Sequence, residues 1–216
     1  MTAEPSAYQI GWVPFLDTKI FLDSRPLIPR TETEYWVEQA LSSLEKTRAL
    51  HILDLFAGSG CIGIALLAHL PQAHVDFAEI DERHFPTIEK NISENGISTE
   101  RVSLIRTDVW SAITGTYDSV FANPPYLSKN RIERVQDSVL AFEPEEALFA
   151  EEDGFALIRR TLEGLLPHLN PGGALYIEHE PEHSVPIKSL ASLLDLKAEV
   201  RKDQYGVLRY SRISTE

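Results

Sequence analysis

Cysteine is almost missing from this sequence, since Cys61 is the single one in 216 residues. A lone cysteine forms no internal disulfide and builds no cluster of thiolate metal ligands, which fits a reducing compartment. Basic residues are also few, with 20 Lys and Arg against 33 Asp and Glu and a formal net charge of -13. Because binding to nucleic-acid phosphates requires clustered Lys and Arg, this balance disfavours direct nucleic-acid binding, although it also serves plain solubility.

Long apolar runs are absent as well. No stretch of about 18 consecutive apolar residues could form a membrane-spanning helix, and residues 1–10 lack the basic stretch and apolar run of a leader peptide. We therefore expect a cytoplasmic protein without membrane contact. The content of 43% hydrophobic and 25% charged residues is typical of one ordinary globular domain.

From residue 50 onward, short apolar runs alternate with helical patterns. The runs that predict strands are 51–55, 73–78, 102–106, 119–122, 174–178, 197–202 and 207–212. The patterns that predict helices are 62–70, 82–95, 154–166 and 185–194. This alternation indicates an α/β fold, a doubly wound, mostly parallel, seven-stranded sheet of the Rossmann-like kind. A turn at 204–206 joins the last two strands into a C-terminal antiparallel hairpin.

Residues 1–49 follow a different pattern. A short β-like stretch around 19–22 precedes a helix over 33–44. We expect an N-terminal segment, 1–49, that packs on a catalytic domain, 50–216.

A glycine-rich loop follows the first predicted strand, in the segment Asp54-Leu55-Phe56-Ala57-Gly58-Ser59-Gly60. Glycines between a strand and a helix let the backbone turn tightly and approach a nucleotide-like ligand closely. The spacing Gly58-x-Gly60-x-x-Gly63 also fits the dinucleotide fingerprint, so NAD is the competing ligand. The Asp54 carboxylate would repel a pyrophosphate but would suit the amino-acid end and the sulfonium of S-adenosylmethionine. Charge therefore favours S-adenosylmethionine as the cofactor of this loop.

Two later acidic residues complete the predicted cofactor site. Glu79 ends the second strand, where its carboxylate could accept both ribose hydroxyls. Asp108 follows the third strand and could accept a hydrogen bond from the adenine amino group, with Val109 or Trp110 against the ring. Each residue also has a simpler interpretation: Glu79 could be a solvated surface residue, and Asp108 could be a turn former.

The segment Asn123-Pro124-Pro125-Tyr126 after the fourth strand is the most specific signal in the chain. An amide or aromatic amino nitrogen has a delocalised lone pair, so it attacks a methyl group poorly unless two acceptors hold and polarise its NH2. Proline keeps the preceding residue extended, which would fix the Asn123 side-chain oxygen and the Pro124 carbonyl for this task, with Tyr126 stacked on the planar group. We predict that residues 123–126 are catalytic and that Asn123 also lies beside the cofactor. A rigid surface turn is the alternative.

These segments resemble the release-factor glutamine methyltransferases over roughly residues 8–212. The family's L-I-P-R-P-E-T-E is similar to Leu27-Ile28-Pro29-Arg30-Thr31-Glu32-Thr33-Glu34, and its joining segment resembles Tyr8-Gln9-Ile10-Gly11. Further family motifs follow in order at 142–148, 152–155 and 203–209. The resemblance implies a class I methyltransferase fold, in which residues 56–60 and Glu79 hold S-adenosylmethionine. It also implies that residues 123–126 hold the glutamine of the Gly-Gly-Gln loop of a peptide-chain release factor, whose side-chain amide nitrogen (N5) is methylated.

The sequence departs from the family pattern in places. Thr31 stands where the family usually has proline, Glu79 where it has aspartate, and Val109 where it has an aromatic residue, which leaves Trp110 as the alternative partner of adenine. The family's N-terminal helical domain, which helps to dock the release factor, has no counterpart in this sequence. We expect a short form, in which a separate subunit could replace that domain.

Other interpretations stay open. The same pocket could methylate a glutamine of a ribosomal protein, or an exocyclic amino group of adenine or cytosine in RNA or DNA. Acidic residues between 143 and 153 argue against a track for a nucleic-acid strand. A protein that binds the cofactor but has lost activity would carry damaged motifs, whereas residues 123–126 are intact.

Two further patterns are interpreted as accidental. His179-Glu180-Pro181-Glu182-His183 matches the H-E-x-x-H zinc pattern, but Pro181 interrupts the helix that this pattern requires. Cys61 opens an apolar helix, where a small buried role is commoner than that of a nucleophile. We therefore expect neither a zinc hydrolase nor a cysteine nucleophile, and no metal.

Overall fold

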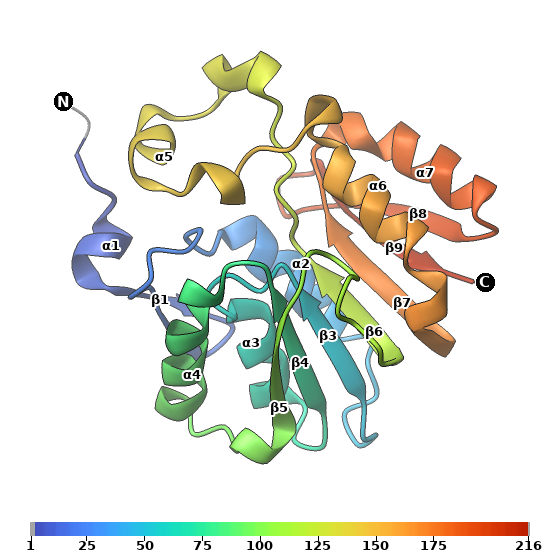
Figure 1. Cartoon of the computed structure of the whole chain (residues 1–216), viewed down its shortest axis with the longest axis horizontal. Helices are drawn as coiled ribbons and strands as arrows, with labels where there is room; N and C mark the ends of the chain where they lie inside the picture. Colours follow the sequence, from blue (N-terminus) through green and yellow to red (C-terminus); the bar gives the residue numbers. More distant parts are fainter. Residues whose placement is uncertain (1–2, 216) are drawn as a thin grey trace.

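A seven-stranded sheet forms the centre of the computed structural model, which describes residues 3–215 (Figure 1). Its strands are β3 (His51–Leu55), β4 (His74–Glu79), β5 (Val102–Arg106), β6 (Tyr117–Ala122), β7 (Leu169–Glu178), β8 (Lys197–Lys202) and β9 (Leu208–Ser214). They lie in the order β5-β4-β3-β6-β7-β9-β8. The strands β3 to β7 pair in parallel, whereas β9 pairs antiparallel with β7 and β8. The predicted sheet and its C-terminal antiparallel hairpin are confirmed.

Helices cover both faces of this sheet. The α-helices of residues 3–215 are α1 (Ser6–Ile10), α2 (Thr31–Leu41), α3 (Cys61–His69), α4 (Phe85–Glu94), α5 (Asp137–Phe142), α6 (Ala156–Glu163) and α7 (Ser184–Leu193). Figure 1 shows α3 and α4 on one side of the sheet and α6 and α7 on the other. Short 3-10 segments stand at Glu82–His84, Thr99–Arg101, Lys129–Arg134, Glu145–Ala147, Glu152–Gly154, Leu166–His168 and Pro181–His183. Among the described residues, no helix is long and apolar enough to cross a bilayer.

Alternation of side chains along the strands divides the core into two layers, because successive residues of a strand point to opposite faces. Ile52 and Phe121 pack with Trp36 of α2 in one cluster, which also contains α3 and α4 side chains. Leu53 and Val120, their neighbours along the chain, belong to the second cluster beneath α6 and α7. Both faces of the sheet are therefore buried, as the near-continuous apolar runs indicate.

The N-terminal segment contributes a small hairpin, of which the sequence predicts only the second strand, around 19–22. β1 (Trp12–Phe15) pairs antiparallel with β2 (Thr18–Phe21). β1 was missed because Pro14 interrupts its pattern and because the connection, Leu16 and Asp17, carries positive φ angles of 42° and 63° without the usual glycine or asparagine. The hairpin is attached to α4, whose Asn91 side chain accepts from Phe21 N at 2.7 Å and donates to Phe21 O at 3.1 Å.

Boundaries shifted where the chain leaves a regular pattern. The helix predicted at 33–44 is α2, which begins and ends earlier, and β7 begins five residues before its predicted start at 174. The region 129–154 holds α5 and three 3-10 turns that no periodic pattern predicted. The expected division into an N-terminal segment, 1–49, and a catalytic domain, 50–216, stays a prediction. Residues 1, 2 and 216 lie outside the described residues.

Candidate functional site

Two cavities meet at the carboxyl ends of the parallel strands, the edge where open α/β sheets bind ligands. One, the glycine-loop cavity, has a volume of about 250 Å³ and is lined by residues 55–59, 78–81, 107–109, Asn123 and Pro125, among others. The second, the proline-turn cavity, measures about 370 Å³ and is lined by Asn123, Pro124, Tyr126, Glu178 and Arg209, among others. Asn123 lines both. The two predicted motifs therefore face one shared space.

The glycine loop has the backbone shape that its composition predicts. Phe56, Gly58 and Gly60 have φ angles of 65°, 55° and 78°, in the left-handed region, which glycine adopts without strain. Gly63 serves a different need, because a Cβ atom there would lie 2.3 Å from the Phe77 ring. A larger residue at 63 would push α3 away from β4 and move the loop.

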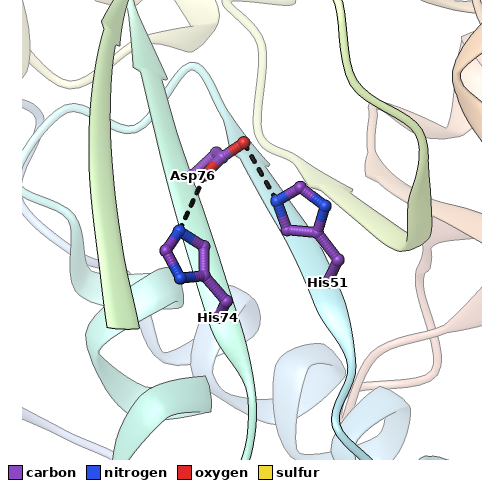
Figure 2. Close-up of side chains that lie close together, drawn as sticks. All are labelled: His51, His74 and Asp76. Atoms are coloured by element: carbon purple, nitrogen blue, oxygen red, sulfur yellow. Dashed lines mark hydrogen bonds and ion pairs between the residues drawn. The ribbon is translucent and has the colours of Figure 1, made fainter. Parts of the chain in front are cut away.

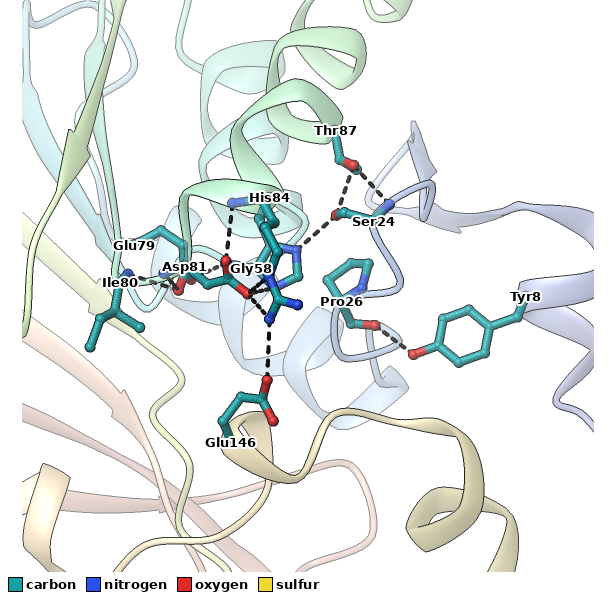
Figure 3. A network of polar contacts seen from close by, with 11 residues as sticks. Tyr8, Ser24, Pro26, Gly58, Glu79, Ile80, Asp81, His84, Thr87 and Glu146 are labelled. Carbon is teal, nitrogen blue, oxygen red and sulfur yellow. Dashed lines mark hydrogen bonds and ion pairs between the residues drawn. The ribbon is translucent and has the colours of Figure 1, made fainter.

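Glu79 joins the loop to the end of β4. Its Oε2 atom accepts a hydrogen bond from Gly58 N at 2.8 Å, and its Oε1 atom accepts from Ile80 N at 2.8 Å and Asp81 N at 3.0 Å (Figure 3). An ionised carboxylate offers about four acceptor positions, so the backbone uses three of them. Glu79 thus fixes the loop and keeps acceptor capacity beside the cavity.

Asp54 lies beneath the loop and does not line the cavity. Its Oδ2 atom accepts from Gly63 N at 2.9 Å, while its buried Oδ1 atom has no hydrogen-bond partner among residues 3–215. Burial away from water raises the pKa of this carboxyl from 3.8 to about 8, because desolvation disfavours its charged form. The carboxylates that line the cavity are those of Glu79, Asp81, Asp108 and Glu146, and Asp54 is not among them.

Of the predicted adenine partners, the structure brings two to the cavity. Asp108 and Val109 line it, and Val109 is only 3% exposed. The Asp108 carboxylate also contacts Arg160 at 2.9 Å. Trp110 lies elsewhere, stacked on His168 at 4.8 Å between ring centroids and donating to Thr161 O at 3.1 Å. Val109, with its positive φ of 54°, turns the chain between these two environments.

The N-terminal segment closes the rim of the glycine-loop cavity through polar contacts. The hydroxyl of Ser24 lies 2.8 Å from His84 Nδ1 and accepts a hydrogen bond from Thr87 at 2.8 Å. The Tyr8 hydroxyl donates to Pro26 O at 2.7 Å, as Figure 3 shows. These bonds hold residues 24–26 against the 82–87 region, and the chain continues from there into the Leu27-Ile28-Pro29-Arg30 motif.

Asn123 is oriented by a buried network built from three distant segments. Its Nδ2 atom donates to Thr33 Oγ1 at 3.4 Å, and that hydroxyl donates to Glu178 Oε2 at 2.6 Å. Glu178 also accepts from Trp36 Nε1 at 2.6 Å and from the Tyr126 hydroxyl at 2.7 Å. Because the amide nitrogen of Asn123 is directed to Thr33, its oxygen is the atom left to face a ligand. Neither that oxygen nor the Pro124 carbonyl accepts a hydrogen bond from a described residue.

Glu178 also acts on Tyr126. Burial, with the Glu178 carboxylate as a second cause, raises the pKa of the Tyr126 hydroxyl well above its usual value. Tyr126 therefore stays a neutral hydrogen-bond donor at any physiological pH.

Two motifs beyond the glycine and proline segments hold this geometry. Gly154 lies against the backbone after the proline turn, so that an added Cβ would come 2.0 Å from the Tyr126 carbonyl. Glu143, buried at 6% exposure, accepts from Ile28 N at 3.0 Å and forms an ion pair with Arg30 at 2.5 Å. The segments around Arg30 and Glu143 are thereby bonded together where they wall both cavities.

The roles of Thr33, Glu178 and Arg209 are not among the residue roles predicted from the sequence. Glu178 ends β7 next to β6, so a carboxylate at the end of an apolar run was the available signal. Arg209 lines the proline-turn cavity and bonds to Asp203 at 3.2 Å across the C-terminal hairpin. Thr33 lies within the Leu27–Glu34 motif, but its contact with Glu178 could not be predicted locally, because the two residues are 145 positions apart.

The residues set aside as accidental patterns have structural surroundings of their own. His179 follows β7 and His183 ends a 3-10 turn, so one helix does not carry both. The His179 nitrogens contact Glu180 O and Ser211 Oγ, each at 2.8 Å, and burial lowers the pKa of His179 to about 4. Cys61 lines the glycine-loop cavity, and burial raises the pKa of its thiol to about 12, which keeps it in the unreactive thiol form.

Comparisons with known proteins agree with this geometry. The Methyltransferase small domain family matches residues 38–147. Over 205 residues the chain is 36% identical to the Release factor glutamine methyltransferase of Lactococcus lactis subsp. lactis, across 94% of this chain and 74% of that protein.

Solved structures share the fold. The ribosomal protein L11 methylase from Lactobacillus delbrueckii subsp. bulgaricus superimposes with a TM-score of 0.64 at 18% identity, covering 88% of this chain and 80% of that one. The N-terminal domain of human METTL16 in complex with SAH gives a TM-score of 0.60 at 18% identity, covering 88% and 73%. At such low identities these two structures support the fold alone.

Proposed function

Because this chain belongs to the release factor glutamine methyltransferase family, we propose that it transfers the methyl group of S-adenosylmethionine to the N5 amide nitrogen of a glutamine in a peptide-chain release factor. Membership of this family confirms the resemblance predicted from the sequence, and the protein is a methyltransferase. The observation that carries the substrate proposal is that Asn123 lines both cavities at once. A methyl donor in one cavity and an amide in the other would meet there.

The glycine-loop cavity has features that suit S-adenosylmethionine. Left-handed Gly58 and Gly60 let the backbone approach a ligand closely. Glu79 keeps about one acceptor position, which suits one ribose hydroxyl, and Asp108 can accept from the adenine amino group beside apolar Val109. The bound cofactor supplies a methyl group that its sulfonium makes electrophilic. The buried, unpartnered oxygen of Asp54 lies just beneath this loop.

The proline turn supplies what an amide nitrogen needs in order to react. Asn123 Oδ1 and the Pro124 carbonyl are acceptors without a partner among residues 3–215, and they can take the two N–H groups of a glutamine amide. Holding both hydrogens orients the nitrogen lone pair and stabilises the positive charge that it gains as the N–C bond forms and the S–C bond breaks. The methylated nitrogen then releases one proton to water, so no ionised base is required.

The test is incubation of candidate substrates with isotope-labelled S-adenosylmethionine, followed by mass spectrometry. Expected is one methyl group on the glutamine of the Gly-Gly-Gln loop of a release factor, and none on a release factor in which that glutamine is replaced by alanine. Label on a ribosomal protein alone would overturn the release-factor proposal but keep the glutamine chemistry. Label on RNA or DNA alone would overturn both.

A further inference from the structure

At the opposite end of the sheet, two histidines and an aspartate converge on one point. His51 and His74 are the first residues of β3 and β4 and are register partners, so their side chains lie on the same face. Asp76 is two residues further along β4 and points to that face as well. Figure 2 shows the two imidazole rings directed at the carboxylate between them. This cluster plays no part in either cavity described above.

The distances within the cluster suit a metal ion. His51 Nε2 lies 3.1 Å from Asp76 Oδ2, and His74 Nε2 lies 3.2 Å from Asp76 Oδ1. The three ligand atoms are all within 4.8 Å of one another. Around a tetrahedral zinc ion with bonds of about 2.0–2.1 Å, neighbouring ligand atoms lie about 3.3 Å apart. Small χ rotations of the two partly exposed rings would close the remaining gap.

Surrounding residues support the aspartate as a ligand. The buried Tyr117 hydroxyl donates to Asp76 Oδ2 at 2.9 Å and fixes the carboxylate, as groups behind a metal ligand commonly do. Ser103, the register partner of Asp76 on β5, places its Oγ 2.9 Å from His74 Nε2 and adds an oxygen at the same point. The His51 and His74 side chains are 38% and 37% exposed, which leaves a path for an ion to enter.

From this geometry we propose that His51, His74 and Asp76 form a binding site for a divalent transition metal of the zinc type. Imidazole nitrogen with one carboxylate oxygen is a donor set that zinc and cobalt accept, whereas magnesium prefers oxygen ligands alone. The ion joins the amino ends of β3 and β4. A fourth position stays open to water. The site is separate from the proposed methyl-transfer site, which lies at the carboxyl ends of the same strands.

Cobalt provides the direct test, because its visible absorption reports coordination. The full chain, without an affinity tag, is titrated with Co²⁺ and then with Zn²⁺ in competition. We expect one cobalt per chain, displaced by zinc and not by magnesium. His51→Gln and His74→Gln should each weaken cobalt binding at least about tenfold. Loss of a residue that only hydrogen-bonds to a metal ligand already costs about this much, so loss of a ligand should cost no less.

His69→Ala is the matched control. His69 is a partly exposed histidine on α3 whose Nε2 contacts Leu16 O at 3.0 Å, away from the cluster, and its replacement should leave the cobalt spectrum unchanged. Circular dichroism verifies that each variant is folded, and Asp76→Asn serves as a further ligand variant if either histidine variant is not. Absence of a cobalt spectrum in the unsubstituted protein overturns the proposal. So does binding that survives both histidine substitutions or that His69→Ala weakens equally.

Discussion

The two cavities that meet at Asn123 are built in different ways. The glycine-loop cavity is shaped mostly by backbone: consecutive residues after β3 turn through left-handed conformations, and Glu79 accepts three backbone N–H groups. The proline-turn cavity is shaped by side chains from far apart in the sequence, since Asn123 bonds to Thr33 across 90 residues and Thr33 to Glu178 across 145. From this difference we infer that the glycine-loop cavity sets the cofactor affinity and that the proline-turn cavity sets the rate of methyl transfer.

The largest effect is expected from Asn123→Ala. Removing one of two acceptors that stabilise charge in a transition state costs about 10²–10³ in kcat, by analogy with oxyanion-hole donors. The cofactor affinity should stay nearly unchanged, because the glycine loop is intact. Single-turnover kinetics and calorimetry with S-adenosylmethionine measure the two quantities separately. Asn170→Ala, remote from both cavities, is the control, and retained turnover in Asn123→Ala would refute the role of this residue.

Glu178→Gln tests whether the network behind Asn123 matters. A glutamine side chain keeps the shape but offers one acceptor oxygen where Glu178 serves Thr33, Trp36 and Tyr126 with two. One of these donors loses its partner, and the Asn123 amide is no longer held in one orientation. We expect kcat to fall about 10²-fold with little change in KM. This is the lower end of the range expected for Asn123→Ala, which removes an acceptor directly. Glu180→Gln removes a neighbouring charge at the same cavity, and an equal loss of kcat there would mean that charge, not orientation, is responsible.

Asp54→Asn examines the glycine loop through stability. Burial raises the pKa of Asp54 from 3.8 in the unfolded chain to about 8 in the folded protein. The protonated carboxyl therefore stabilises the fold fully below pH 3.8, and this stabilisation is lost as the pH rises to about 8. The unsubstituted protein should therefore lose about 2–3 kcal/mol of unfolding free energy between about pH 6 and about pH 8.5 relative to Asp54→Asn. Denaturant titrations at both pH values measure this. Asp137→Asn, at an exposed position, should show the same loss of stability with pH as the unsubstituted protein. If Asp54→Asn showed that loss too, the raised pKa of Asp54 would be contradicted.

Glu79→Ala should separate the two cavities in the opposite sense from Asn123→Ala. It removes the acceptor that anchors Gly58 N, together with the acceptor proposed for the ribose. A hydrogen bond to a charged group contributes about 1.5–3 kcal/mol, so cofactor affinity should fall about tenfold or more. The kcat at saturating cofactor should fall much less. If kcat fell while affinity held, the proposed division between the cavities would be wrong.

The same contrast explains what the sequence could predict. The β-α alternation and residues 54–60 and 123–126 are local patterns, and they predicted the sheet and the two motifs that meet at the cavities. Thr33 lies in a family motif and Glu178 ends an apolar run, but no local pattern predicts their contact, which exists only once α2 and β7 are brought together. Trp110 was a reasonable aromatic candidate, yet one residue of left-handed backbone at Val109 directs it to His168 instead. Side-chain direction at such a turn depends on packing that no periodicity reports.

The smallest effect is expected at Thr31, the first residue of α2, which carries Thr33 into the network. The family pattern that this segment resembles usually has proline here, and Arg30 before it is extended, with φ -101° and ψ 152°, as proline favours for the residue that precedes it. The Thr31 N–H has no acceptor within residues 3–215, so nothing is lost with it. Thr31→Pro should therefore stabilise the fold by about 0.4–1 kcal/mol through the unfolded chain.

Thermal unfolding measures this gain, and Thr31→Ala isolates the loss of the exposed hydroxyl. If the start of α2 moves in the unsubstituted protein, Thr31→Pro should change the kcat set by the proline-turn cavity and leave the cofactor affinity of the glycine-loop cavity unchanged. A rigid helix start that raised kcat without changing cofactor affinity would mean that motion of Thr33 limits the proline-turn cavity. Unchanged kcat would mean that Glu178 and Trp36 already hold α2 in place. Destabilisation by Thr31→Pro would contradict the helix start at this residue, and with it the path by which Thr33 reaches Asn123.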